Sequence, residues 1–518
     1  MKLGLLRSVH PSYDSDTWVS YEALYRGGKD FKAHIGRFLT KNPVEPLDVY
    51  LQRKSEAAYR SYVGPIVDYF ASQLMAAPLT IRCVSRESGD SVETVDPYYS
   101  TFKEDADGQG TDLVDLARNT FRTSLIKGAC WFVAAQPSQD GEPPQTRADW
   151  EDRRLGEIKV GKIEPNNVLD WECDDSGSLV WVITYDESRP RATPLDSRSR
   201  IRGVWRIFDT KTVTTFEHDW DEKDGPGDDD KALSPVSVEP HGFNRVPLVR
   251  VELPRGLWLM NRVADAQTEH FRLSSGLGWS IRRTCYAMPV FKMAGGSSGP
   301  GPVMGAGYFL TIGENDDVVW VAPPPQPFSV IADEIKSQKD EIYRVSQQMA
   351  QGVDNNAAAV GRSADSKRAD ASATEVCLVA YGAVVKEALE KLYDLVAEGR
   401  GDAVKFHVGG LDKFNLADPT VAVDNASKAN ALNVPSETFN KELMMHTADA
   451  LLPGLTQEKK DAIGKEIEAG IKQQMAEKEE AKRAAEAALL AAPPKPGAPG
   501  GPGPKNKMTP KEPENGED

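Results

Sequence analysis

The sequence predicts an α+β fold that combines a region of short antiparallel strands with several long helices. Between residues 158 and 250, short runs rich in Val, Ile, Thr and Trp alternate with turn residues, which indicates strands. On either side of this region apolar residues recur at helical spacing. At 518 residues, with 40% hydrophobic and 27% charged residues, the chain is long enough to bury several cores.

Residues 1–46 are interpreted as an N-terminal arm, and a helix is predicted over residues 47–77. Gly64-Pro65 is expected to kink or split this helix, because proline disrupts a helix interior. The apolar positions that predict it are Leu51, Ala58, Tyr62, Ile66, Phe70 and Leu74. The run "PLTIRCV" then predicts a strand, and "TDLVDLARNTFRTSLIKGACWFVAA" predicts a helix that stops at Gly128 and a buried strand.

Further strands are predicted in the segments "IKVGKIEPNNVLDWE", "SLVWVITYDES", "SRIRGVWRIFD", "KTVTTFEHD" and "HGFNRVPLVRVELP". Three tryptophans in these runs, Trp171, Trp181 and Trp205, are expected to be core aromatics rather than a binding cage. The loop 219–231 is acidic. Its residues Asp228, Asp229 and Asp230 could bind a cation, but a solvated loop is the favoured interpretation.

Two further helices, over residues 257–287 and 327–352, flank a Gly/Pro-rich segment, 288–326, that contains the strand-like runs "YFLTI" and "DVVWVA". Steps of three and four residues between apolar positions predict that each helix packs on another helix. The positions of these seams that we single out are Leu273, Leu277, Ile335, Ile342, Val345 and Met349. His270, on the first seam, is expected to be a packing or surface residue rather than a ligand.

A polar loop is predicted over residues 353–372, and a further helix follows it. The seam of that helix consists of Leu378, Val385, Leu389, Leu392 and Val396. The run "AVKFHVGG" predicts a strand, and residues 424–490 are expected to be helical. The Pro/Gly-rich residues 491–518 predict a disordered tail.

No sequence pattern predicts an active site, a cofactor or a metal. The chain lacks a P-loop motif, and neither "GGSSG" (295–299) nor "GPGPVMGAG" lies between a strand and a helix as nucleophile elbows and dinucleotide folds require. The seven histidines are dispersed. Five scattered cysteines without a CxxC pair argue against a disulfide scaffold or a zinc site and for a reducing cytoplasm. We therefore expect a structural or assembly protein rather than an enzyme.

Charge and hydropathy exclude two further classes. A net charge of −16 argues against tight binding of nucleic acid, which requires a basic surface, so either DNA is irrelevant to the protein or the protein touches DNA without holding it. The chain contains no run of eighteen apolar residues, which is the pattern that predicts a membrane span, so no membrane partner is expected.

The order of these features resembles that of the portal proteins of tailed bacteriophages. The segments "YLQRKSEAAYRSYVGPIVDYFASQLMAAPLTI", "KIEPNNVLDWE" and "GFNRVPLVRVELP" are similar to segments that precede the first stem helix of that family. The resemblance implies a wing (47–256), stem helix 1 (257–287), a β-containing clip (288–326) and stem helix 2 (327–352). It further implies a tunnel loop (353–372), a wing and spine segment (373–423), an α-helical crown (424–490) and the tail (491–518).

The resemblance also implies a function: a dodecameric ring at one capsid vertex of the virion, assembled in the host bacterial cytoplasm. Double-stranded DNA would pass through the ring during packaging and ejection. The implied protein partners are the large terminase, the major capsid and scaffolding proteins, and the head–tail connector. The alternatives are another ring-forming virion or scaffold protein, and an enzyme with an unrecognised site in the α+β region.

The resemblance assigns roles to particular residues. The clip would dock partners through Tyr308, Phe309, Val319 and Trp320, and the stem seams would pack within and between subunits. The tunnel loop would border DNA through Asn355, Asn356, Arg362, Ser363, Lys367 and Arg368. Three aspartates, Asp354, Asp365 and Asp370, balance its three cations, and a neutral loop contacts phosphates without trapping them. An ordinary surface loop is the alternative interpretation of 353–372.

Overall fold

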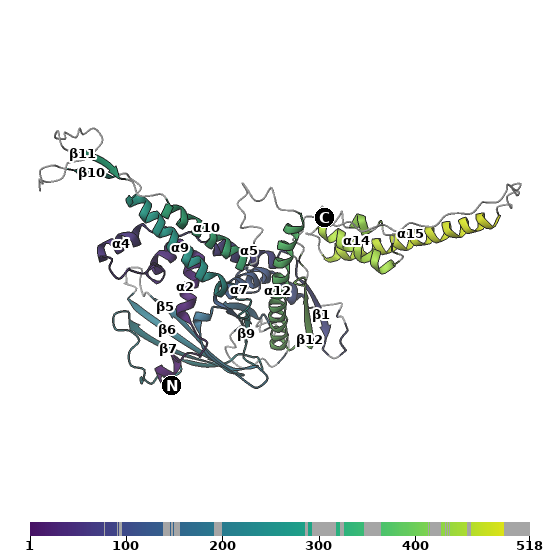
Figure 1. The fold of residues 1–518 in the computed structure, drawn as a ribbon. Coiled ribbons are helices and arrows are strands. Elements are labelled where there is room, and N and C mark those ends of the chain that lie inside the picture. Colours follow the sequence, from purple (N-terminus) through teal and green to yellow (C-terminus); the bar gives the residue numbers. More distant parts are fainter. Residues whose placement is uncertain are drawn as a thin grey trace. The chain divides into compact units, whose positions relative to one another are not determined.

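The computed structural model describes residues 1–76, 78–86, 88–90, 92, 96–137, 146, 149, 156–190, 199–284, 288–292, 317–321, 326–346, 364–412, 414, 426–429, 431, 434, 436–452 and 457–491. Contacts divide the chain into two units, residues 1–418 and residues 419–518. The first unit mixes helices with antiparallel sheets, which agrees with the predicted α+β class (Figure 1). None of the helices in the described ranges is long and apolar enough to cross a bilayer.

The helices of the first unit are α1 (Leu3–Leu6), α2 (Ser15–Arg26), α3 (Gly28–His34), η1 (Ile35–Arg37), α4 (Leu47–Glu56), α5 (Val63–Leu74), α6 (Pro97–Glu104), α7 (Leu113–Lys127), η2 (Pro165–Asn167), α9 (Leu259–Thr284), α10 (Gln326–Val345) and α12 (Ala364–Arg400). Its strands are β1 (Thr80–Ser85), β2 (Ala129–Ala135), β3 (Lys159–Ile163), β4 (Val168–Cys173), β5 (Leu179–Ser188), β6 (Arg200–Phe208), β7 (Thr212–Asp221), β8 (Ser237–Pro240), β9 (Leu248–Glu252), β10 (Met288–Lys292), β11 (Asp317–Val321) and β12 (Val404–Gly409).

The strands form four antiparallel sheets. Their orders are β4-β5-β6-β7-β8, β3-β2-β9, β1-β12 and β10-β11. The runs predicted as strands between residues 158 and 250 are confirmed as β3 to β7 and β9. Because each run carries its own apolar alternation and turn residues, local sequence was sufficient to predict them.

The predicted stop at Gly128 is confirmed. Asp112 caps the start of α7 by accepting a hydrogen bond from the Asp115 amide at 2.6 Å. Gly128 has a φ of 84°, in the left-handed region that glycine adopts without strain, and it turns the chain into β2. The Trp258 ring lies against Gly128, so a larger residue there would be both strained and crowded.

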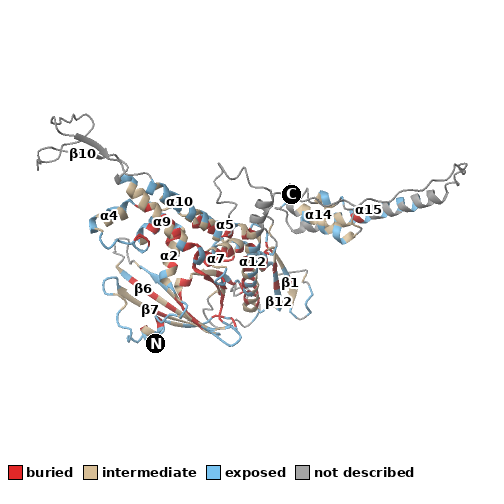
Figure 2. Cartoon of the chain, in the orientation of Figure 1, coloured by how far each residue is buried: buried red, intermediate tan, exposed pale blue. Residues whose placement is uncertain are grey.

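The main core lies around α12, which packs on α5, α7, β9 and β12 (Figure 2). All five residues of the predicted α12 seam are buried, which confirms that face. The predicted face of α5 is buried as well, at Ile66, Phe70 and Leu74. Two smaller clusters cover opposite faces of the five-stranded sheet, one around Trp131 and Trp171 and one around Leu3, Leu6 and Trp205.

The helix predicted over residues 47–77 is split, as expected, into two helices, α4 and α5, but the predicted position of the split is wrong. The break lies at residues 57–62, not at Gly64-Pro65. Tertiary hydrogen bonds hold this break, since the Tyr59 and Ser61 hydroxyls both donate to the Leu24 carbonyl, at 2.6 and 2.9 Å. Pro65 lies in the first turn of α5, where its missing N–H costs no hydrogen bond.

The prediction of an N-terminal arm is also wrong. Residues 1–46 contain α1, α2, α3 and η1, and their side chains Leu24, Phe31 and Phe38 are buried in the main core. Leu3 and Leu6 are fully buried against the five-stranded sheet. These apolar residues lie in or directly after short helices, and their burial depends on contacts with distant parts of the chain.

The second unit contains α14 (Glu437–Leu451) and α15 (Gln457–Ala491), which pack on each other. Ile471 is buried between them, and Lys441 pairs with Glu468 at 2.6 Å. The expectation of helices over residues 424–490 is confirmed for these two segments. The predicted tail from 492 onwards lies outside the described residues.

Candidate functional site on the helical hairpin

Five of the predicted site residues, Leu273, Leu277, Ile335, Ile342 and Val345, lie on the pair α9 and α10. β10 follows α9 and β11 precedes α10, and these two strands are antiparallel. Arg262, near the start of α9, shares a groove with Val345 at the end of α10. The two helices are therefore antiparallel, and β10-β11 extends the end of the hairpin (Figure 1).

The predicted seam of α10 faces α9. Six of its buried or partly buried positions repeat every three or four residues: Phe328, Ile331, Ile335, Gln338, Ile342 and Val345. Ile342 is fully buried. On α9, Leu273 and Leu277 are partly buried, and Met349 lies outside the described residues. α9 and α10 contact each other within one chain. The packing roles assigned to the seam residues, within and between subunits, stay predictions.

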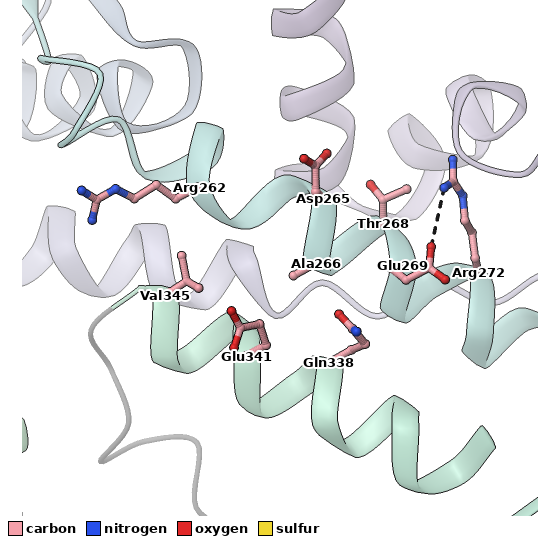
Figure 3. A pocket seen from close by; sticks show the side chains of 9 residues that line it. All are labelled: Arg262, Asp265, Ala266, Thr268, Glu269, Arg272, Gln338, Glu341 and Val345. Atoms are coloured by element: carbon pink, nitrogen blue, oxygen red, sulfur yellow. Dashed lines mark ion pairs between the residues drawn. The ribbon is translucent and has the colours of Figure 1, made fainter. Parts of the chain in front are cut away.

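A charged groove runs along one side of the hairpin (Figure 3). Arg262, Asp265, Glu269 and Arg272 of α9 line one wall, and Gln338, Glu341 and Val345 of α10 line the other. Within the groove Arg272 pairs with Glu269 at 3.6 Å and also donates from Nε to the Phe38 carbonyl at 2.9 Å. The groove contains two arginines and three carboxylates, so its net charge is small. Its open shape resembles a packing surface more than a catalytic cavity.

The opposite face of α9 carries buried polar residues. The Gln267 side chain accepts from the Tyr62 amide at 2.9 Å and donates to the Arg60 carbonyl at 3.0 Å, which ties α9 to the start of α5. His270 is buried with its ring edge-on to Tyr62. Burial lowers the pKa of His270, and the nearby cations Arg60 and Lys339 lower it further. His270 is thus a neutral packing residue, as expected.

The predicted clip is only partly described. Val319 and Trp320 lie in β11, opposite Val290 and Pro289 of β10. The strand-like run "YFLTI", with Tyr308 and Phe309, lies outside the described residues. β10 was not predicted from the sequence as the partner of β11, because the run "MPVFK" that forms β10 is short and contains a proline.

The predicted boundary of the tunnel loop is wrong, because α12 begins at Ala364 and not at residue 373. Lys367 and Arg368 therefore lie on the first turns of a helix. The stretch "ADSKRADASATEV" explains the difference, since its alanines, lysine and arginine favour helix and it contains no Gly or Pro. Asn355, Asn356, Arg362 and Ser363 lie outside the described residues.

The structure does not support the cation site or the tryptophan cage that were considered as alternatives. Asp229 pairs with Arg7 at 2.7 Å and Asp230 with Lys2 at 2.9 Å, so this acidic loop holds the N-terminal segment. Trp171 and Trp205 are buried and Trp181 packs on the same sheet, which confirms them as core aromatics. In the part of the chain that the structure describes, no group of three His, Cys, Asp or Glu residues could hold a metal ion. The "GGSSG" segment lies outside that part.

The sequence reading missed two exposed apolar surfaces. One is on α4, at Leu47 and Leu51, and the other is on α12, at Val376 and Val379. A signal for the second was present, because α12 carries apolar residues at helical spacing on a second face as well as on its seam. A helix with two apolar faces predicts two packing partners.

Comparison with known proteins gives distant structural likeness only. No family model matches the chain, and a search of curated proteins finds no match. Among solved structures, a chain of "Virion of native gene transfer agent (GTA) particle" is 12% identical with a TM-score of 0.40, covering 83% of this chain and 99% of that chain. A chain of "Neck of empty GTA particle computed with C6 symmetry" is 13% identical with a TM-score of 0.42 and the same coverage. A chain of "Neck of native GTA particle computed with C12 symmetry" is 11% identical with a TM-score of 0.38, covering 89% of this chain and 97% of that chain.

Proposed function

We propose that this chain is the subunit of a phage-type portal: a dodecameric ring at one capsid vertex through which double-stranded DNA is packaged and ejected. One observation carries the proposal. A mixed α/β body is followed by α9, the β10-β11 pair, the antiparallel α10 and then the 37-residue α12, in that order. This order is the succession of wing, stem, clip, stem and spine that the sequence resemblance implies.

The hairpin end suits the docking of partners. Among the described residues β10 and β11 form a two-stranded sheet, in which each strand pairs with one other strand. Unpaired strand edges accept strands from another chain. In the proposed ring these edges join neighbouring clips, and the completed clip binds the terminase and later the head–tail connector.

The segment between α10 and α12 suits the channel. It joins two long helices through residues 346–363. Within residues 353–372, which include the first turns of α12, three cations are balanced by three aspartates. Each phosphate that a protein neutralises adds affinity, which would resist sliding of the DNA. The balanced segment and the net charge of −16 both fit a channel that DNA passes through without being retained.

The test is the native mass of the purified protein, combined with negative-stain imaging. Twelve copies of a 56.8 kDa chain give a ring of about 680 kDa with a central hole, which we expect to see. A compact dimer that persists at high protein concentration would exclude the portal assignment. The same sample with a terminase subunit then tests docking, which we expect to depend on the β10-β11 end of the hairpin.

A further inference from the structure

Two apolar surfaces of the first unit are exposed and have no partner among the residues that the structure describes. The first, named here the α4 patch, consists of Val44, Leu47 and Leu51, with 95%, 62% and 53% of their surface exposed. Leu47 and Leu51 are four residues apart and lie on one face of α4. α4 has no buried residue, although the Tyr50 hydroxyl and an Arg53–Glu45 ion pair hold it in place.

The second surface, named here the α12 stripe, consists of Val376, Val379 and Ala383. These residues are three and four positions apart, so they follow one face of the helix. Val376 is 67% exposed and Val379 is 41% exposed, whereas the other faces of this half of α12 pack into the main core. Further along the same face the surface becomes charged, with a Glu387–Lys391 ion pair at 2.7 Å.

The two surfaces lie on different sides of the first unit: α4 beside the outer part of α9, and α12 beyond α7 (Figure 1). A charge without a partner adjoins each of them. Asp48 follows Leu47 on α4, and Lys386 is one turn beyond Ala383 on α12. Neither of these two charges has an ion pair or hydrogen bond within the described part of the chain.

We propose that the α4 patch of one copy packs on the α12 stripe of the next copy, with Asp48 facing Lys386. Two different surfaces on separate sides of one chain form a head-to-tail contact, which closes into a ring when the rotation between copies allows it. A symmetric dimer would instead need one self-complementary surface. The inference rests on the proposed ring and names the surfaces that build it.

Single substitutions test each surface. Leu51→Asp and Val379→Asp each put a charge at the centre of one surface, so we expect each to convert rings into monomers at equal concentration. The control is Val236→Asp, since Val236 is 62% exposed outside both surfaces and should still give rings. Circular dichroism and thermal unfolding should match the wild type, because all three positions are exposed. Rings in either Leu51→Asp or Val379→Asp would overturn the inference.

Mixing the two variants tests whether the surfaces meet each other. Leu51→Asp retains a normal α12 stripe and Val379→Asp retains a normal α4 patch, so one intact contact remains between them. We expect the mixture to give a heterodimer and nothing larger, measured by native mass spectrometry of differently tagged chains. If the surfaces met different partners, two monomeric variants would stay monomeric when mixed, and the proposed pairing would be wrong.

Exchanging the two charges tests whether Asp48 of one copy faces Lys386 of the next. Asp48→Lys and Lys386→Asp alone should each weaken assembly, because each places like charges opposite one another. The double variant Asp48→Lys/Lys386→Asp should recover wild-type assembly, and failure to recover would refute the facing pair. Wild-type rings that none of these variants disturbs would overturn this interface and leave the portal proposal standing. A wild type that forms no ring at any concentration would count against both.

Discussion

The Lys127 ammonium lies 2.6 Å from the Glu164 carboxylate, at a site where only 6% of the lysine side chain is exposed. The same ammonium lies 3.2 Å from Glu22 and donates to the Asn166 amide oxygen at 2.8 Å. One buried cation thus joins α2, the end of α7 and the turn before β4. This junction connects the helical core to the five-stranded sheet. Weakening it should therefore lower the stability of the whole first unit.

We expect Glu164→Gln to destabilise the protein near neutral pH and to have little effect in strong acid. Burial opposes ionisation of Glu164, but hydrogen bonds and charges from Lys127 and Lys162 outweigh it and lower its pKa to about 2. A lowered pKa means that the stabilisation is fully present above the ordinary value of 4.5 and is lost as the pH falls towards 2. The difference in Tm between wild type and variant should therefore shrink on acidification. A difference that stays constant from about pH 6 to about pH 3 would contradict this assignment.

Two glycine substitutions should have opposite effects. A Cβ on Gly382 of α12 would collide with the main-chain carbonyl of Leu411, which cannot move without displacing β12, so we expect Gly382→Ala to cost about 1–3 kcal/mol. A Cβ on Gly276 of α9 would meet nothing, so Gly276→Ala should stabilise the helix by about 1 kcal/mol. Urea unfolding of both variants measures these changes. Equal effects at the two sites would mean that α12 is not packed closely on the 409–411 backbone.

Arg400, at the end of α12, should be among the most sensitive charged residues. Its guanidinium pairs with Asp96 at 2.8 Å and Asp402 at 2.9 Å, donates to the Gly156 carbonyl at 2.7 Å and lies 4.0 Å from the Tyr98 ring centre. Burial disfavours its charge, but the two aspartates more than compensate and raise its pKa. Arg400→Ala should cost about 2–4 kcal/mol, because two partly buried carboxylates lose their cation.

Two further variants refine that measurement. Arg400→Lys keeps the charge but loses the planar fork and the ring contact, so it should recover only part of the stability. Arg344→Ala is the matched control, because Arg344 pairs only with Glu341 on the exposed face of α10. It should leave thermal unfolding unchanged. A loss at Arg344 as large as the loss at Arg400 would show that burial does not set the difference.

The parts of the fold that could be predicted from sequence are those with a local cause. The α12 seam, the strands β3 to β7 and the Gly128 stop each follow from periodicity or from one residue's backbone preference. The N-terminal segment could not be predicted in the same way. Arg7 pairs with Asp229 across 222 positions of sequence. The Leu24 carbonyl that holds residues 57–62 also belongs to a separate segment, and no local pattern links the two.

In the candidate site, too, features with a local cause could be predicted from sequence and features that depend on the folded structure could not. Spacing alone identified the α10 face that packs on α9, because Ile335, Ile342 and Val345 repeat at helical intervals. Spacing does not say which chain supplies a partner. Leu51 served only to predict a helix and Val379 was not singled out from the sequence, so only their exposure in the folded unit marks them as surfaces for another molecule.

The last prediction concerns the segment between α10 and α12. The triple variant Arg362→Ala/Lys367→Ala/Arg368→Ala should assemble into normal rings but package DNA poorly. Alanine is compatible with the helical start of α12, so the loss would come from the missing cations rather than from unfolding. Without them, only the aspartates of this segment would face the phosphates, and the balanced contact would become a repulsive one.

A packaging assay with purified rings and terminase measures this effect as the fraction of DNA protected from nuclease. The matched control is Lys29→Ala/Lys32→Ala/Lys103→Ala, which removes the same charge from exposed positions elsewhere in the first unit. Equal packaging by the two triple variants would show that net charge, and not this segment, sets the effect. Loss of the ring in the first variant would show instead that the segment holds subunits together, and its assignment to the channel would then be wrong.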